Sequence, residues 1–239
     1  MDIRWTLDGH VSLADKAGRW CEVSSTKIKI LKLGIKYPDQ KFATMTSNPQ
    51  WHTASVSNVD NYISSYRCAT LIARAIKNNN SISSVSKPNG MVKANYTKMK
   101  NQISGISWSS ALGDIKVTAN NKALFVIGMA MHIVTDTYSH QSYVKVNGRW
   151  KHLNHADDNC DNSSVRKKRF TIAGDAASDV LGAYLVGDTG DHWEYVQDYD
   201  GTSFRLKRLV KYAQEQDTYN ADTFGDLAKL KKGDVAYAD

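Results

Sequence analysis

The feature that most constrains this chain is an apolar run that continues into regularly spaced polar residues. Residues 123 to 131 (ALFVIGMAM) lead into HIVTDTYSH, which places His132, Asp136 and His140 at intervals of four. On a helix, four residues turn through roughly 400 degrees, so the three side chains share one face and span about 12 Å along the axis. Apolar residues cover most of the remaining circumference, which predicts a helix buried nearly all round.

The burial of Asp136 needs a physical explanation. A buried ionised carboxylate requires a compensating charge, which a divalent metal ion can supply. The alternative is a hydrogen-bonded Asp–His network within the core, the usual arrangement for a single buried histidine. Other histidines in short punctuated segments favour the metal: these are His10 after TLDG, His52 in PQWH, and His152 and His155 in KHLNHADDN.

The hydrophobic periodicity predicts a predominantly helical chain. Helices are expected at residues 10–22, 59–77, 91–104, 120–140, 163–186 and 204–217. Residues 24–36 alternate enough to be strand or helix. Residues 38–58 hold two of the three prolines and read as an extended connection, and residues 78–90 read as an exposed loop. We expect a single helical domain over residues 1–239, in which 187–239 is a turn-rich segment followed by the last helix.

Composition limits the classes of partner. A chain of 239 residues with 41% hydrophobic content can bury a sizeable core. The apolar run of residues 123–131 is far shorter than the roughly 18–20 residues of a membrane span, so no transmembrane segment is predicted. A formal net charge of +7 favours anionic partners such as phosphates, nucleic acid or acidic lipid headgroups, although the lysines and arginines are scattered.

Several common site types are excluded by the absence of their motifs. The three cysteines, Cys21, Cys68 and Cys160, show no zinc-finger spacing. No Gly-rich phosphate loop and no nucleophile elbow occur, so nucleotide-binding and serine-hydrolase interpretations lack support.

Four segments together resemble one known family. LFVIGMAMHIVTDTYSH (124–140) is similar to a ligand segment of the zinc-dependent phospholipases C and of the related single-strand-specific zinc nucleases. WTLDGHVSLADKA (5–17) resembles the start of the nucleases, LKLGIKYPD (31–39) resembles a phospholipase segment that ends in a ligand Asp, and PQWH (49–52) matches the next ligand His. The resemblance covers residues 5 to about 180. It implies an all-α domain of the zinc-dependent phospholipase C type, with up to three zinc ions between the helices.

Transferred to the matching positions, the resemblance implies ligands for two neighbouring zinc ions. The first would be held by Asp39, His52, His132 and Asp136. Asp136 would bridge to the second, which also takes His10 and the amine and carbonyl of Trp5. In the family this Trp begins the mature chain. We therefore expect Met1 to Arg4 to be residues added over a removed leader, and the protein to be secreted or extracytoplasmic.

A third zinc would be held by His140 and His155, and here the chain departs from the family. The family's third acid aligns with Asn159, and helical geometry favours Asp158 as its substitute because residues i and i+3 share a face. A pairing of His152 with His155 is a competing option. The interval between the two histidines of the central segment is also shorter than in the family and lacks its proline.

The implied activity is phosphodiester hydrolysis. Zinc lowers the pKa of bound water from 15.7 toward about 7, which gives metal-bound hydroxide at neutral pH. In the family the Asp that matches Asp39 has also been assigned a catalytic base role. We expect a phospholipase C-like zinc phosphodiesterase acting on a phospholipid headgroup, with peripheral contact to a membrane surface. The alternatives are a single-strand nuclease of the same superfamily and a non-catalytic, metal-stabilised binding protein.

Overall fold

The computed structural model describes residues 7–44, 47–52, 60–89, 91–139, 141–146, 149–154 and 167–186. This part of the chain is predominantly helical, which confirms the predicted all-α class. In chain order the helices are α1 (Leu7–Trp20), α2 (Ser25–Lys41), α3 (Pro49–His52), α4 (Asp60–Lys77), the 3₁₀ helix η1 (Ile82–Ser84), α5 (Lys93–Ser104), α6 (Trp108–Leu112), α7 (Ala119–Ser139) and α8 (Lys167–Leu185).

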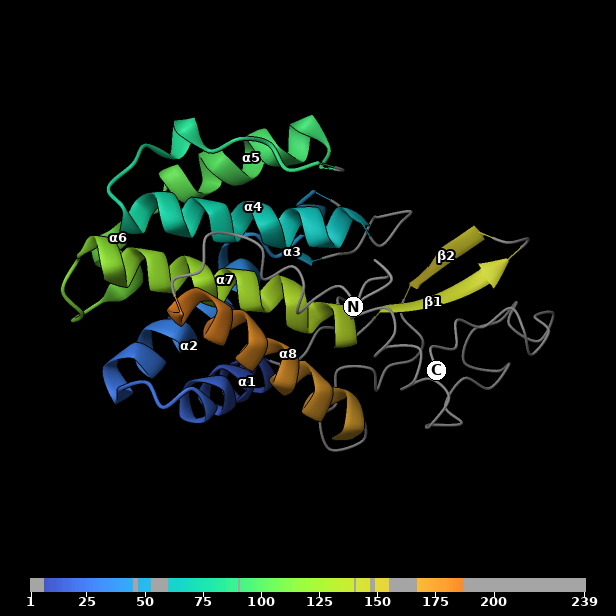
Figure 1. Cartoon of the computed structure of the whole chain (residues 1–239), viewed down its shortest axis with the longest axis horizontal. Coiled ribbons are helices and arrows are strands. Elements are labelled where there is room, and N and C mark those ends of the chain that lie inside the picture. The colour runs from blue at the N-terminus through green and yellow to red at the C-terminus, as the bar shows by residue number, and fades with distance from the viewer. Residues whose placement is uncertain are drawn as a thin grey trace.

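Helix α7 lies at the centre of the arrangement. Figure 1 shows α4 and α5 on one side of it, α1 and α2 on the other, and α8 across it. Every residue from 123 to 136 is buried, as the apolar sequence of this segment predicts. A side chain on any face of α7 between residues 123 and 136 therefore lies among protein atoms rather than in bulk water.

Helices α2 and α7 cross at two glycines. A Cβ on Gly34 would lie 2.1 Å from the carbonyl oxygen of Phe125, and a Cβ on Gly128 would lie 2.7 Å from a backbone oxygen of α2. Because the two backbones touch, neither position has room for a side chain. Asp39 follows one of these glycines by five residues and His132 follows the other by four. The crossing therefore fixes how far apart these two side chains lie.

The structure resolves the ambiguous segment 24–36 as the first part of α2, and it corrects the extended connection predicted for 38–58. Residues 38–41 continue α2, and residues 49–52 form α3. The helix continues through Pro38 because the inner face of α2 is buried as far as this residue. Only one turn follows, and the Phe42 amide closes the helix on the Pro38 carbonyl oxygen.

The remaining helix predictions agree with the structure where it describes them. The segments 59–77, 91–104, 120–140 and 163–186 correspond to α4, α5, α7 and α8 within a few residues. The segment 78–90 is largely exposed over its described residues and contains the short η1. The helix predicted at 204–217, like all of 187–239, lies outside the described residues.

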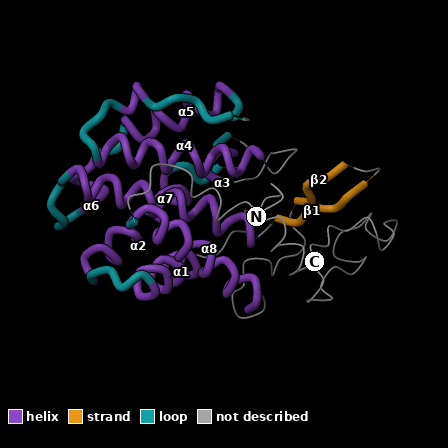
Figure 2. Tube along the Cα trace, viewed as in Figure 1, coloured by secondary structure: helices purple, strands orange, loops and turns teal. Residues whose placement is uncertain are grey.

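One element was not predicted. Strands β1 (Gln141–Val146) and β2 (Arg149–Asn154) form an antiparallel hairpin after α7, with Val146 opposite Arg149. Figure 2 shows the hairpin at one end of the helices. The sequence between the two strands is Asn-Gly, which is the strongest short signal for a two-residue hairpin turn. The signal was therefore present in the sequence.

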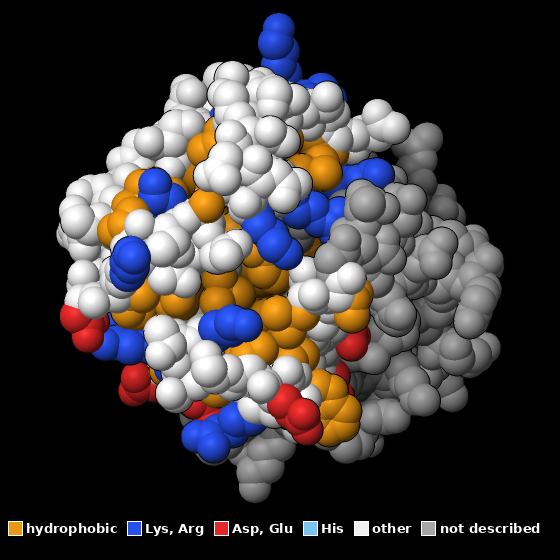
Figure 3. All heavy atoms as spheres, turned by 60° about the vertical axis from the view of Figure 1, so that its left-hand side comes forward, with side chains coloured by type: hydrophobic (Ala, Val, Ile, Leu, Met, Phe, Trp, Pro, Cys, Tyr) orange, Lys and Arg blue, Asp and Glu red, His pale blue; other side chains and the backbone are white. Residues whose placement is uncertain are grey.

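Two features bear on possible partners: the apolar length of the described helices and the distribution of basic side chains on the face drawn in Figure 3. None of the described helices is both long and apolar enough to cross a bilayer. In Figure 3 the basic side chains are scattered among neutral and apolar ones. Of the described cysteines, Cys21 and Cys68 are unbonded thiols, and burial raises the pKa of Cys68 to about 12.

Candidate metal centre

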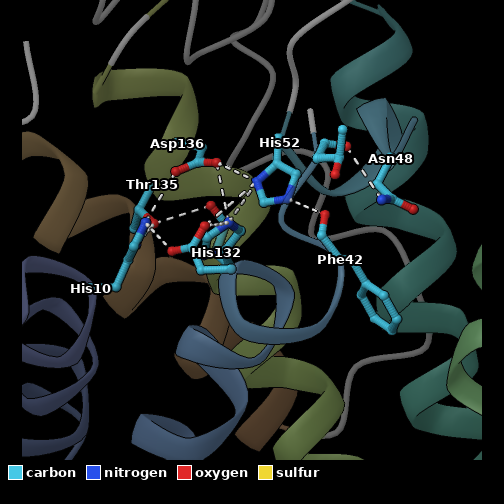
Figure 4. Close-up of polar contacts among 9 residues, drawn as sticks. His10, Phe42, Asn48, His52, His132, Thr135 and Asp136 are labelled. Carbon is cyan, nitrogen blue, oxygen red and sulfur yellow. Dashed lines mark hydrogen bonds and ion pairs between the residues drawn. The ribbon is translucent and has the colours of Figure 1, made fainter. Parts of the chain in front are cut away.

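Five of the predicted ligands converge on one point inside the molecule. They come from four helices: His10 from α1, Asp39 from α2, His52 from α3, and His132 and Asp136 from α7. Figure 4 shows the labelled histidines and Asp136 turned toward one another. The side chain of Asp39 is 10% exposed, and the other four are fully buried. The other predicted ligands lie outside the described residues: Trp5, His140, His155 and Asp158.

Four of these side chains form what we call the four-donor group: Asp39, His52, His132 and Asp136. His52 Nδ1, His132 Nε2 and Asp136 Oδ2 stand 3.2 to 3.3 Å from one another. Asp39 Oδ1 lies 3.8 Å from each of the two imidazole nitrogens. Donors about 2.0–2.2 Å from a zinc ion at tetrahedral angles stand roughly 3.3–3.6 Å apart. The two imidazole nitrogens therefore lie close to ligand spacing from each other and from one oxygen of each carboxylate.

His10 and the second oxygens of Asp136 and Asp39 form what we call the His10 group, which lies beside the four-donor group. His10 Nε2 lies 3.1 Å from Asp136 Oδ1 and 3.7 Å from Asp39 Oδ2. Each carboxylate thus turns one oxygen to the four-donor group and the other to His10. The rings of His10 and His132 are also close, with centroids 4.3 Å apart. Asp136 contacts both groups, as a bridging ligand would, and Asp39 has the same arrangement, which the sequence did not indicate.

The electrostatics of the centre favour a cation over a protonated histidine. Burial is the largest cause that lowers the pKa of His10, and the neighbouring His132 lowers it further; the nearby carboxylates offset this only in part. A neutral imidazole is the form that binds metal ions. Asp136, which is fully buried, therefore has a neutral His10 beside it, and a carboxylate in this position requires positive charge.

Two hydrogen bonds orient the histidine rings from behind. His10 Nδ1 lies 3.1 Å from the Thr135 hydroxyl oxygen, and His52 Nε2 donates to the Phe42 carbonyl oxygen at 2.9 Å. Sequence reasoning missed both partners. Thr135 stands within the central segment but off the four-residue spacing, and Phe42 acts through its backbone, which no side-chain motif can reveal.

The short helix α3 is held in place by a side-chain network. The buried Trp51 donates its indole N–H to Gln102 Oε1 at 2.7 Å, and Gln50 donates to the same oxygen at 3.0 Å. Gln102 in turn donates to Asn48 Oδ1 at 2.8 Å. Trp51 is thus a packing residue. The network fixes α3 against α5 and so fixes the position of His52.

Comparison with known proteins identifies no relative: no family model, no curated protein and no solved structure matches the chain. The resemblance to the zinc phospholipases and nucleases therefore rests on the four sequence segments and stays a prediction. What the geometry shows is that His10, Asp39, His52, His132 and Asp136 form a cluster that could hold a metal ion.

Proposed function

We propose that the protein is a zinc-dependent phosphodiester hydrolase of the phospholipase C type. The observation that carries the proposal is the spacing of the four-donor group, in which the two imidazole nitrogens lie 3.2 Å apart and each stands 3.2 to 3.8 Å from an oxygen of both carboxylates. The group draws on three helices, and the residues belong to segments whose order resembles the ligand order of that family. A core network of neutral hydrogen bonds would not need two carboxylates at one point.

The donor chemistry favours zinc over other common divalent ions. Imidazole nitrogen with carboxylate oxygen in four-coordinate geometry suits zinc, whereas magnesium and calcium prefer oxygen ligands in larger numbers. When bound, zinc lowers the pKa of a coordinated water toward about 7 and neutralises charge on phosphoryl oxygens.

The two groups of donors are suited to different roles. The four-donor group would hold an ion with protein side chains alone, as structural zinc sites do. The His10 group offers fewer donors among the described residues, so an ion held there would leave room for water or substrate, as catalytic sites require. Asp39 contacts both groups and is the one of the five side chains that reaches solvent. We assign Asp39 the acceptance of a proton from the attacking water, and we expect substrate to approach from its side.

Between substrates, we favour a phospholipid headgroup. The segment that carries Asp39 resembles the phospholipases, while the segment that carries His10 resembles the nucleases. The net charge of +7 suits either phosphodiester. The expected location, secreted or extracytoplasmic, agrees with a lipid or nucleic acid outside the cell.

A second candidate function is that of a binding protein stabilised by a structural metal. It is favoured by one observation: four of the five donors are fully buried, and the four-donor group alone completes a closed site. In this case one ion would contribute folding free energy and no substrate would be hydrolysed.

Metal analysis of the purified chain separates these functions, with Asp136→Asn as the variant and Asp114→Asn as its matched control. Asp114 is 79% exposed and pairs with Lys29 on the surface. About two or more zinc ions per chain, with at least one lost in D136N and none in D114N, supports the hydrolase. About one zinc and no turnover supports the structural role, and no bound metal contradicts both.

Turnover is then measured with a phosphatidylcholine analogue and with single-stranded DNA. We expect cleavage of the lipid analogue, complete loss of this activity in D136N, and unchanged activity in D114N. Cleavage of DNA alone would replace the phospholipase assignment by the nuclease one. A fully zinc-loaded chain that cleaves neither substrate would contradict phosphodiester hydrolysis.

A further inference from the structure

The hydrogen bond behind His52 determines which of its ring nitrogens carries hydrogen. His52 Nε2 lies 2.9 Å from the Phe42 carbonyl oxygen, and a carbonyl oxygen can only accept. Nε2 is therefore the protonated nitrogen of the neutral ring. His52 Nδ1 then presents a lone pair to the four-donor group, where it lies 3.3 Å from Asp136 Oδ2.

The same reasoning gives His10 the opposite assignment. The Thr135 hydroxyl donates its single hydrogen to the His132 carbonyl oxygen at 3.1 Å. Toward His10, the Thr135 oxygen can then only accept, so His10 Nδ1, 3.1 Å away, is the nitrogen that donates. The lone pair of His10 lies on Nε2, which faces Asp136 Oδ1 at 3.1 Å.

We propose that the Phe42 carbonyl and the Thr135 hydroxyl hold His52 and His10 in opposite tautomers, so that Nδ1 of one ring and Nε2 of the other are both presented to cations. Thr135 is in this sense a positioning residue, because it acts on the cation through His10. These two hydrogen-bond partners would prepare the histidine rings to bind the cations of the proposed hydrolase. The biological meaning of the tautomers therefore rests on the proposed function.

One contact supports the assignment independently. His10 Nε2 is fully buried and makes no hydrogen bond in acceptable geometry, although a carboxylate oxygen of Asp136 lies only 3.1 Å away. Two acceptors at this distance repel each other unless a positive charge lies between or beside them. Because this contact does not have hydrogen-bond geometry, a hydrogen on Nε2 would gain no bond there and would block the cation.

The test is nitrogen-15 NMR of the histidine side chains, recorded on the full chain at pH 8. Long-range nitrogen–proton correlations distinguish a ring protonated on Nδ1 from one protonated on Nε2. The chain is measured as purified and again after chelation, so the result does not depend on which metal is bound or on any activity. We expect Nδ1–H for His10 and Nε2–H for His52. The same tautomer in both rings would overturn the proposal.

Variants at Thr135 test the cause. In Thr135→Val, which keeps the shape and removes the hydroxyl, we expect His10 to lose its single tautomer. We also expect the weaker-bound zinc to lose about 10- to 100-fold in affinity, measured by competition with a chromophoric chelator. Thr135→Ser should preserve both properties. If the His10 tautomer and the zinc affinity are the same in Thr135→Val as in Thr135→Ser, the Thr135 hydroxyl does not set the tautomer of His10. Intact tautomers in a chain that hydrolyses nothing would reject only the proposed function.

Discussion

Two of the helix pairs that approach each other closely at glycine differ in what the glycine meets. At the α2–α7 crossing, Gly34 and Gly128 place backbone against backbone, with an added Cβ 2.1 to 2.7 Å from a carbonyl oxygen. Where α1 meets α8, a Cβ on Gly174 would approach only the side chain of Lys16, at 2.6 Å. A carbonyl of a helix cannot move alone, whereas the end of a lysine side chain can.

The difference shows which part of the metal centre is rigidly placed. The α2–α7 crossing carries Asp39 on one helix and His132 and Asp136 on the other, so most of the four-donor group is positioned by touching backbones. His10 lies on α1, whose contact with α8 runs partly through an exposed ion pair between Lys16 and Asp175. The His10 side of the centre therefore has more freedom to adjust.

The largest effect is expected for Gly34→Ala or Gly128→Ala. Either methyl group forces the helices apart, at a cost of roughly 3 kcal/mol or more in the free energy of unfolding. The higher helix propensity of alanine returns only about 1 kcal/mol. Urea denaturation measures the loss, and zinc content should fall with it because the donors separate. Wild-type stability in either variant would show that the crossing is not as tight as described.

A smaller effect of opposite sign is expected for Gly182→Ala. Gly182 lies in α8, and an added Cβ would meet no atom within 4 Å. The substitution should stabilise the protein by about 0.5–1 kcal/mol, because alanine favours the helix and restricts the unfolded chain. The same denaturation experiment serves as the matched control for the two variants at the crossing. A lower free energy of unfolding in Gly182→Ala would mean that α8 rejects alanine for a reason other than a steric clash at the added Cβ.

The smallest effect is expected for Gly174→Ala. The gain in helix propensity should be nearly cancelled, because Lys16 has to leave Asp175 and the Thr171 carbonyl oxygen, and a surface pair of this kind is worth about 0–1 kcal/mol. In a Lys16→Ala background the obstacle is gone, and G174A should then stabilise as G182A does. A double-mutant cycle measures this coupling. If the effects of Lys16→Ala and Gly174→Ala simply add, Lys16 is not the obstacle at Gly174, and the contrast between the α1–α8 and α2–α7 contacts is wrong.

The sequence predicted the parts of this molecule that depend on local pattern. The buried helix α7 and the grouping of His132 with Asp136 follow from periodicity, since an apolar run with two polar positions four apart allows few other structures. The convergence of His10, Asp39 and His52 on that helix came from the resemblance and not from spacing. Periodicity says nothing about which distant segments meet.

Other features depended on tertiary structure or on an overlooked signal. Pro38 was taken as the start of an extended segment, whereas burial of the inner face of α2 carries the helix past it. The roles of the Phe42 carbonyl and of Gln102 are invisible in sequence, because one is a backbone atom and the other acts across 51 residues on Trp51. The hairpin of β1 and β2 could have been found from the Asn-Gly sequence between the two strands.

The scattered origin of the donors has a consequence for synthesis. His10, Asp39 and His52 leave the ribosome first, while His132 and Asp136 follow only after a further 80 residues or more. Until then the early residues lack the carboxylate that holds them together, and α2 has no partner for its glycine. An ion held by these donors could be captured only after α7 has been translated and has docked, so any metal binding at this cluster would follow the docking of α7.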